Sequence, residues 1–396
     1  MEKRDGVLIV GAGPVGFITA LGLARAGIPV TVIEAEAKII DAPRAAVYFP
    51  VTLEFLEQLG IVEDAHAIGV RNEELQVRYR DAGESYVLTT TTIRGDTPYP
   101  YQLHFGQNEL AGLVHRRLLE LPGTDVRFNT RLTGIVQDSS GVTAMVQSPA
   151  GDTELRVDWL VGCDGGRSGV RKSLGLSFGG HTWPERFVAT NVRYDGFGRY
   201  GLGLANFYSH PERWTVVAVI SKDGLWRVTY NEDGDCSDEE AIRRVPGRYQ
   251  DLFPDMGPHE LVAVSPYRVH ERISEKLRVG RVLLAGDAAH VCNPCGGMGL
   301  TTGLMDARAL IEALGAVIHG TADESVLDFY AGERRRVFLE ITTPSATEYR
   351  RLLGEKDPER RRQDRENLQH VASHPEIMRQ NFLSLFDTRG KPMLTQ

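Results

Sequence analysis

Apolar residues at the start of the chain are grouped in a pattern that predicts a strand, a tight turn, a helix and a second strand. Residues 7–10 form a short apolar run typical of a buried strand, and residues 17–26 are rich in Ala, Leu and Ile, which favour a helix. Gly27 is a helix-ending residue, and the apolar residues 30–33 follow it. This order indicates an α/β fold.

The apolar pattern changes character twice further along the chain. Residues 52–60 and 107–121 are predicted to be helical, and strand-like runs dominate three other stretches, which are residues 70–105, 125–161 and 180–270. The α/β pattern returns at residues 280–285, before a glycine-rich loop and another helix. The Arg- and Glu-rich segment 333–365 is predicted to be solvated helix. One α/β domain interrupted by β-rich insertions accounts for this order.

Composition excludes several classes of protein. The chain has 396 residues, and its 45 Lys and Arg against 53 Asp and Glu give a net charge of −8. It therefore has no general electrostatic reason to bind nucleic acid or an anionic membrane, and no apolar run is long enough to span a bilayer. Four cysteines are too few for a disulfide scaffold. We expect a cytoplasmic protein, monomeric or homodimeric, without nucleic-acid or membrane partners.

His290, Cys292 and Cys295 have a spacing that metal sites also use. They supply only three potential ligands, whereas structural zinc normally has four. No second Cys pair or His cluster accompanies them. We therefore expect no metal here, but small residues that fill a tight loop.

The turn after the first predicted strand has the spacing of a dinucleotide-binding loop, Gly11-Ala12-Gly13-Pro14-Val15-Gly16. Gly11 permits the sharp turn, Gly13 lets the backbone approach a pyrophosphate, and Gly16 lets the helix pack close to the strand. Glu34, at the end of the second strand, is placed to accept hydrogen bonds from an adenosine ribose and would repel a 2′-phosphate. The turn suits FAD or NAD and does not choose between them.

Two more glycine–aspartate clusters follow predicted strands. Asp164, in residues 163–171, could hold phosphate and ribose or could simply cap the next helix. Asp287, in residues 280–290, could bind a polyol, and the glycine-rich residues 294–303 lead into a helix whose free N–H groups suit an anion. A second G-x-G-x-x-G at residues 196–201 precedes a strand-like run, so we interpret it as a β-turn region.

The three clusters together resemble the flavoprotein aromatic hydroxylases of the para-hydroxybenzoate hydroxylase family. That family combines G-x-G-x-x-G, D-G-x-x-S-x-V-R and G-D-A-A-H leading to P-x-G-G-x-G, in the order found here over about residues 5–345. Arg44 and Gln107 also resemble family positions near FAD. The resemblance implies a Rossmann-like FAD-binding domain with an inserted β-rich substrate domain and C-terminal helices. It divides the chain into an FAD-binding domain (1–72, 102–178 and 272–340), a substrate domain (73–101 and 179–271) and a C-terminal helical segment (341–396).

The clusters and the resemblance name the residues expected to contact FAD. Asp164 would also help a passing nicotinamide nucleotide, and the backbone N–H groups of Leu300 and Thr301 would face the flavin N1–C2=O edge. Thr301 replaces the Asn of many members, which preserves a backbone role but not an amide role. The expected cofactor contacts are Gly11, Gly13, Pro14, Val15, Gly16, Glu34, Ala35, Arg44, Gln107, Asp164, Gly286, Asp287, Gly297, Gly299, Leu300 and Thr301.

The resemblance also implies a reaction. NADH or NADPH reduces FAD, the reduced flavin and O₂ form a C4a-hydroperoxide, and its distal oxygen passes to a phenolic or hydroxypyridine-type ring. Some short members displace a ring substituent as they hydroxylate. The substrate is expected between the β-rich insertion and the 294–297 loop, with Tyr208, His210 and Pro294 as catalytic candidates and Trp226, Tyr230 and Gly296 as substrate-binding candidates.

Two alternatives stay open at this point. A flavin-dependent reductase or oxidase on the same fold would show the same cofactor motifs, and so would a non-enzymatic FAD-binding regulatory protein. The three differ in whether NAD(P)H oxidation depends on oxygen and on an aromatic compound.

Overall fold

A six-stranded sheet lies at the centre of the cofactor domain in the computed structural model, which describes residues 2–3 and 6–394. Its order is β19 (Arg278–Val279), β20 (Val282–Leu284), β13 (Trp159–Gly162), β2 (Val7–Val10), β3 (Val30–Ile33) and β9 (Thr124–Arg127). All neighbouring pairs are parallel except β19–β20. Because the chain moves outward from β2 to β3 and β9 and then returns to β13, the crevice beside β2 is a topological switch point.

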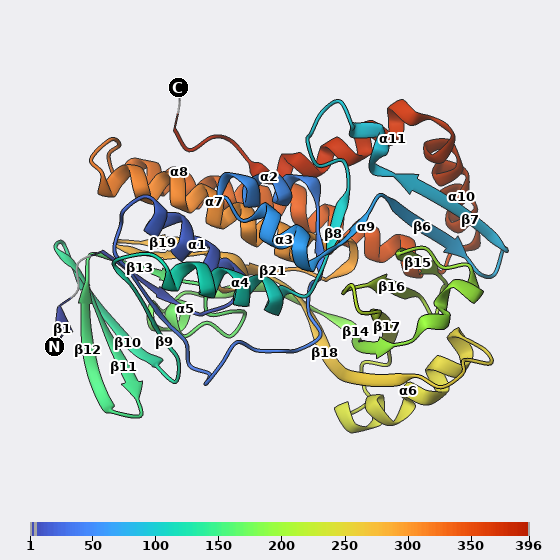
Figure 1. Cartoon of the computed structure of the whole chain (residues 1–396), viewed down its shortest axis with the longest axis horizontal. Coiled ribbons are helices and arrows are strands. Elements are labelled where there is room, and N and C mark those ends of the chain that lie inside the picture. The colour runs from blue at the N-terminus through green and yellow to red at the C-terminus, as the bar shows by residue number, and fades with distance from the viewer. Residues whose placement is uncertain (1, 4–5, 395–396) are drawn as a thin grey trace.

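Both faces of this sheet are buried, as the apolar strand sequences require. One face packs against α1 (Pro14–Arg25), α4 (Gln107–Leu119) and α7 (Met298–Ile318). The other face packs against the antiparallel strands β10 (Arg131–Asp138), β11 (Gly141–Ser148) and β12 (Gly151–Val157), which β1 (Glu2–Lys3) extends. Figure 1 shows these strands at the end of the molecule that carries the N-terminus.

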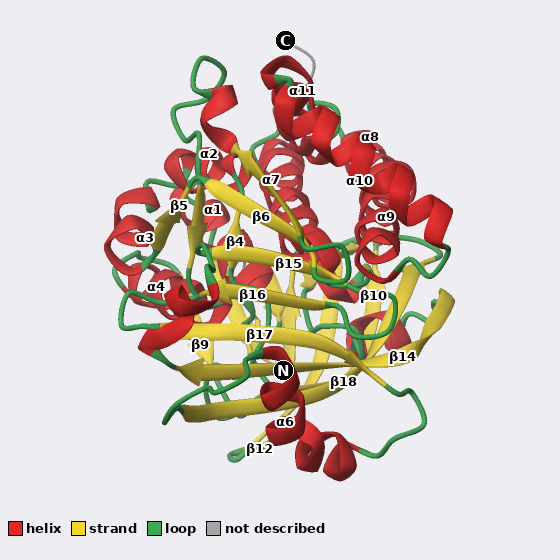
Figure 2. Ribbon diagram, turned by 90° about the vertical axis from the view of Figure 1, so that its right-hand side faces the viewer, coloured by secondary structure: helices red, strands yellow, loops and turns green. Residues whose placement is uncertain are grey.

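An eight-stranded sheet forms the other half of the molecule (Figure 2). Its order is β21 (His290–Val291), β18 (Glu260–Ser274), β14 (Phe178–Arg193), β17 (Leu225–Glu232), β16 (Thr215–Val219), β15 (Ala205–Ser209), β6 (Glu74–Tyr79) and β7 (Glu84–Thr89). The two β-rich insertions therefore meet in one sheet, through parallel pairing of β15 with β6. Helix α6 (Asp238–Leu252) packs on one face.

The remaining elements connect and cover these sheets. A small sheet is formed by β4 (Val47–Tyr48), β8 (Gln102–His104) and β5 (Val70–Asn72). The other helices are α2 (Pro50–Gln58), α3 (Val62–Ile68), α5 (Gly169–Ser173), α8 (Ser325–Val337), α9 (Thr343–Gly354), α10 (Pro358–Ser373) and α11 (Pro375–Leu383), and a π-helical turn (Phe338–Thr342) joins α8 to α9. Among the described residues, no helix has both the length and the apolar character needed to cross a bilayer.

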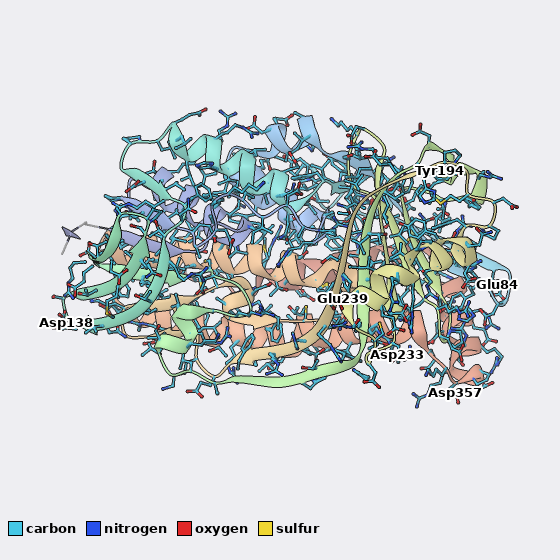
Figure 3. All side chains as sticks on the ribbon, turned by 90° about the horizontal axis from the view of Figure 1, so that it is seen from below. Glu84, Asp138, Tyr194, Asp233, Glu239 and Asp357 are labelled. Atoms are coloured by element: carbon cyan, nitrogen blue, oxygen red, sulfur yellow. The ribbon has the colours of Figure 1, made fainter. Side chains whose placement is uncertain are left out.

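The predicted elements and the structure agree closely at the glycine-rich turns and less well elsewhere. The second G-x-G-x-x-G forms a 3₁₀ helix (Asp195–Tyr200) with Phe197 buried against the α6 core, so it is no dinucleotide loop. The Arg- and Glu-rich segment is helical, but the prediction that it is solvated is wrong for Arg334 and Arg361, which are buried, and α8 ends in the π-helical turn. The acidic side chains labelled in Figure 3 lie on outer elements, with Asp138 at one end of the molecule and Glu84 and Asp357 at the other.

Candidate cofactor and substrate site

Three glycine-containing loops, far apart in sequence, meet at the carboxyl ends of β2, β13 and β20. Gly11 has φ of +109°, and a Cβ added there would lie 2.4 Å from the Cys163 carbonyl oxygen. A Cβ added at Gly286 would lie 2.9 Å from Val15. These positions need glycine because backbone from one loop contacts the next. The predicted convergence of the three clusters is therefore a property of the structure.

The first loop leaves an open space beside the start of α1. A Cβ added at Gly13 would meet no atom within 4 Å, whereas one added at Gly16 would lie 2.0 Å from the Gly11 carbonyl oxygen. Gly16 is thus required by helix packing, and Gly13 faces free space. Glu34 closes the loop, because its carboxylate accepts hydrogen bonds from Ala12 N (2.8 Å) and Glu36 N (2.9 Å). An open space at a helix N-terminus is the geometry that a pyrophosphate requires.

Asp164, in the second loop, caps α5. Its carboxylate accepts hydrogen bonds from the Ser168 hydroxyl (2.5 Å), Gly169 N (2.6 Å) and Val170 N (3.1 Å). The capping alternative considered for this residue is therefore what the structure shows. Contact of Asp164 with FAD or with a nicotinamide nucleotide stays a prediction.

The third loop presents Asp287 to the same crevice. Its side chain is exposed, yet burial around it raises the pKa of its carboxyl above the ordinary value, and Arg44 acts in the opposite direction. Arg44 is on the loop after β3, and Gln107 N donates to the Ala45 carbonyl oxygen (3.1 Å). The structure thus brings the Arg44 segment, the first residue of α4 and Asp287 close together.

The loop before α7 needs glycine at two positions, because its backbone has positive φ there and a neighbouring ring packs closely against it. Gly296 and Gly297 have φ of +76° and +69°, and a Cβ at Gly296 would lie 2.3 Å from the Tyr349 ring. Because α7 begins at Met298, its unpaired N–H groups belong to residues 298–300. Thr301 is buried, and its hydroxyl donates to the Gly297 carbonyl oxygen (3.2 Å). Leu300 therefore has a backbone N–H without a partner inside the helix, as predicted. The predicted contact of the Thr301 N–H with the flavin stays a prediction.

Three aromatic candidates lie on the face of the eight-stranded sheet that packs against α6. Tyr208, Trp226 and Tyr230 belong to that core. The 294–297 loop packs on the opposite face, where Cys295 contacts the cluster that contains Phe187. The structure therefore does not bring these three aromatics to Pro294 and Gly296. The reason is the two-residue period of a strand, which sends neighbouring side chains to opposite faces.

His210 lies at the end of β15, where its partners belong to α9 and to its own turn and not to the 294–297 loop. Its backbone N donates to the Leu353 carbonyl oxygen (2.9 Å), and its Nδ1 accepts from Glu212 N and Arg213 N (both 3.1 Å). The ring is therefore held as the cap of a turn after β15. His290, in contrast, packs beneath the Gly286–Asp287 turn with its Nε2 2.8 Å from Asp306.

The site-facing side of the sheet carries residues that the sequence reasoning missed. Arg227 lies between Trp226 and Val228, and its Nε donates to Asn191 Oδ1 (3.0 Å). Among the described residues, no carboxylate lies within ion-pair distance of Arg227 and its Nη groups have no hydrogen-bond partner. Burial lowers the pKa of the guanidinium to about 10, with Tyr267 and Asp41 acting in the opposite direction. Arginine within an otherwise apolar strand segment was the available signal.

Comparison with known proteins decides which cofactor this crevice serves. The FAD binding domain family model matches residues 5–345. The chain belongs to the flavoprotein aromatic hydroxylases. A para-nitrophenol 4-monooxygenase of Pseudomonas sp. (strain WBC-3) is 42% identical, with 100% of this chain and 98% of that protein aligned. The hydroxylase is also 40% identical to a 6-hydroxy-3-succinoylpyridine 3-monooxygenase of Pseudomonas putida (strain DSM 28022 / S16), over 90% of this chain and 91% of that protein.

Solved structures agree with this assignment of the hydroxylase. The crystal structure of p-nitrophenol 4-monooxygenase from Pseudomonas putida DLL-E4 has a TM-score of 0.95 at 42% identity, covering 99% of this chain and 100% of that one. Aklavinone-11 hydroxylase, solved with FAD and aklavinone, has a TM-score of 0.78 at 28% identity, covering 89% and 70% of the two chains. The hydroxylase is therefore an FAD-dependent aromatic monooxygenase, and the open space at Gly13 and the exposed Asp287 fit FAD.

Proposed function

We propose that the hydroxylase oxidises a phenolic or hydroxypyridine-type ring, with NADH or NADPH and O₂ as co-substrates, and that Arg227 binds the ionised ring oxygen. The observation that carries this proposal is the inward-facing Arg227, which has no carboxylate within ion-pair distance among the described residues. A cation in that setting favours an anionic ligand. Both relatives named above act, by name, on rings that bear a hydroxyl group.

Ionisation of the substrate is the step that Arg227 assists. A free phenol has a pKa of about 10, and an adjacent cation lowers the pKa of such a group. The phenolate donates electron density to its ring, which makes the ortho and para carbons better targets for an oxygen electrophile. Asn191 Oδ1 fixes the Arg227 side chain through Nε and leaves the Nη groups for the substrate.

The other site residues hold the reaction partners in place. FAD supplies the redox and oxygen chemistry when it is bound. The unpaired N–H groups of residues 298–300, at the N-terminus of α7, favour negative charge next to them. Phe187 and Tyr267 belong to the apolar cluster next to the 294–297 loop and exclude water from it. The proposed balance is substrate, O₂, NAD(P)H and a proton giving hydroxylated product, NAD(P)⁺ and water.

A positive stripe beside the crevice suits the phosphates of the nicotinamide nucleotide. Arg268, His270 and Arg272 alternate along β18, and Arg167 extends from the Asp164 loop. The four are close enough that, after burial, the three arginines lower the pKa of His270. None of the three arginines forms an ion pair with a carboxylate among the residues that the structure describes. We propose that NAD(P)H docks on this stripe.

The docking proposal predicts a selective effect of Arg272→Gln. Losing one charge–phosphate interaction is expected to raise KM for NAD(P)H about 5- to 20-fold, while KM for the aromatic substrate stays within about twofold, consistent with about 1–2 kcal/mol for a hydrogen bond to a charged group. Arg244→Gln is the matched control, because Arg244 lies in α6 and pairs with Glu232 at the end of β17. Steady-state kinetics at two salt concentrations measure the effect, and equal changes in both KM values would contradict it.

The activity itself is tested by following NAD(P)H oxidation with a panel of phenols and hydroxypyridines, under air and under nitrogen. The proposal expects aromatic-stimulated, oxygen-dependent oxidation that yields a ring-hydroxylated product. Turnover without an aromatic compound and without oxygen would indicate a reductase. A yellow protein with no turnover on any ring would favour the regulatory alternative.

A further inference from the structure

A wholly buried carboxylate, that of Asp306, links the third cofactor loop to helices α7 and α8. Asp306, in the third turn of α7, accepts hydrogen bonds from Gly286 N (2.9 Å) and Arg334 Nε (2.7 Å), and His290 Nε2 lies 2.8 Å from it. Gly286 immediately precedes Asp287, whose side chain is exposed beside the cofactor loops. One carboxylate thus holds the backbone of the third cofactor loop against the helix whose N-terminus borders the same crevice.

Arg334 extends this contact to the C-terminal segment. The side chain is wholly buried in α8, which packs along α7 (Figure 1). It donates to the carbonyl oxygens of Thr388 (2.9 Å), Arg389 (3.1 Å) and Thr302 (3.3 Å). Each of its three nitrogens therefore donates to at least one acceptor, and these bonds fix the guanidinium against Asp306.

The π-helical turn after α8 completes the support of His290. Phe338, the first residue of that turn, stacks on the imidazole of His290 with 4.4 Å between ring centroids. At its other end the Thr342 hydroxyl is 2.8 Å from the Thr302 hydroxyl. π-helical turns of this kind often accompany functional sites. Here the turn places one ring against the cofactor loop and one hydroxyl against α7.

A buried ion pair is weak evidence for stability alone, since apolar residues of the same volume often serve a core as well or better. The net effect of the surroundings is nevertheless to keep Asp306 charged: burial raises the pKa of its carboxyl, but His290 and Arg334 outweigh it and hold the pKa below the ordinary value. A charged acceptor strengthens the hydrogen bond from the Gly286 N–H, which holds the turn where Gly286 has φ of +59°.

We propose that Asp306 is a positioning residue for FAD: it fixes the Gly286–Asp287 turn and the α7 N-terminus in one geometry, and Arg334 orients it. The proposal rests on FAD binding in this crevice and is independent of which ring the hydroxylase oxidises. Asp306 acts through Gly286 and touches no cofactor atom itself. Replacing the Asp306 carboxylate should therefore lower the affinity for FAD by more than the loss of core stability alone explains.

The test compares Asp306→Asn with a double variant, Asp306→Asn with Arg334→Met. The single variant leaves the Arg334 charge buried without its partner, so part of its effect will be lost stability. The double variant removes both charges and is expected to recover most of the thermal stability of the apo chain. It still lacks the carboxylate that holds Gly286, so its Kd for FAD is expected to stay at least 10-fold above that of the wild type.

The control is Asp364→Asn. Asp364 is also a buried carboxylate held by an arginine, because each of its oxygens is 2.9 Å from a nitrogen of Arg351. It lies in α10, which packs beside β7 and not beside the cofactor loops. Its loss should lower thermal stability and leave the Kd for FAD within about twofold. Kd is measured by quenching of FAD fluorescence on binding to the apo chain, and stability by thermal unfolding of the same preparations.

Two results would overturn the proposal. One is a double variant that binds FAD as tightly as the wild type, which would make Asp306 a purely structural residue. The other is an equal loss of FAD affinity in Asp306→Asn and Asp364→Asn, which would reduce the effect to general destabilisation. A wild-type chain that takes up no FAD would instead overturn the cofactor site itself, and activity on phenols does not enter either comparison.

Discussion

Replacing Gly13 with valine is expected to abolish FAD retention while leaving the apo chain folded. Gly13 has φ of −76° and ψ of 177°, which any residue adopts, and its added Cβ meets no atom within 4 Å. The side chain therefore costs the protein itself almost nothing. It fills the space beside the α1 N-terminus in which the backbone must approach a pyrophosphate. We expect Kd for FAD to rise at least 100-fold, measured by fluorescence titration.

Gly16→Ala is the matched comparison for this prediction. Its Cβ would lie 2.0 Å from the Gly11 carbonyl oxygen, so the helix must move away from the strand. Overpacking of this kind costs about 1–3 kcal/mol of stability. The two variants should thus separate: Gly13→Val loses FAD at unchanged apo melting temperature, and Gly16→Ala melts earlier with or without FAD. Tight FAD binding by Gly13→Val would show that the pyrophosphate lies elsewhere.

The cofactor half of the site could be predicted from the sequence because its chemistry is local. Each loop is a strand end followed by glycines in a recognisable spacing, and some of their roles depend on close sequence neighbours, as with Gly16 against the Gly11 carbonyl oxygen. The parallel order of β20, β13 and β2 then brings the loops together without further information. Family membership, the fold class and FAD-dependent aromatic hydroxylation were predicted from the resemblance that these three motifs carry together, and the comparisons confirm them.

The substrate half could not be predicted in the same way. In β17, Trp226 and Arg227 differ by one position and face opposite sides of the sheet, and nothing in that segment of sequence states which side packs against α6. The aromatic residues were proposed as substrate-binding or catalytic because of their chemistry. In the structure they pack in the core against α6 instead. Asp306 illustrates a second limit: its partners Gly286 and Arg334 are 20 and 28 positions away, and only the fold brings them together.

Replacing Arg227 with methionine is expected to lower kcat/KM for a phenol about 100-fold or more, equivalent to about 2.7 kcal/mol of transition-state stabilisation. Methionine keeps much of the side-chain volume and removes the charge, so the sheet should still pack. The pKa of Arg227 is about 10, so the wild-type guanidinium is protonated throughout pH 7–9 and holds the phenolate at each of these values. The wild-type kcat/KM should therefore change little over this range.

The variant should respond differently to pH and to the acidity of the ring. Without the cation, the phenolate must form in solution, so kcat/KM of Arg227→Met should rise with pH toward the substrate's own pKa. Acidic phenols, already ionised at pH 8, should lose several-fold less activity than unsubstituted phenol. Arg213→Met, which removes an exposed arginine paired with Asp251, serves as the control and should match the wild type. A uniform loss across the phenol series, with a wild-type pH profile, would show that Arg227 supports packing and does not bind the ring oxygen.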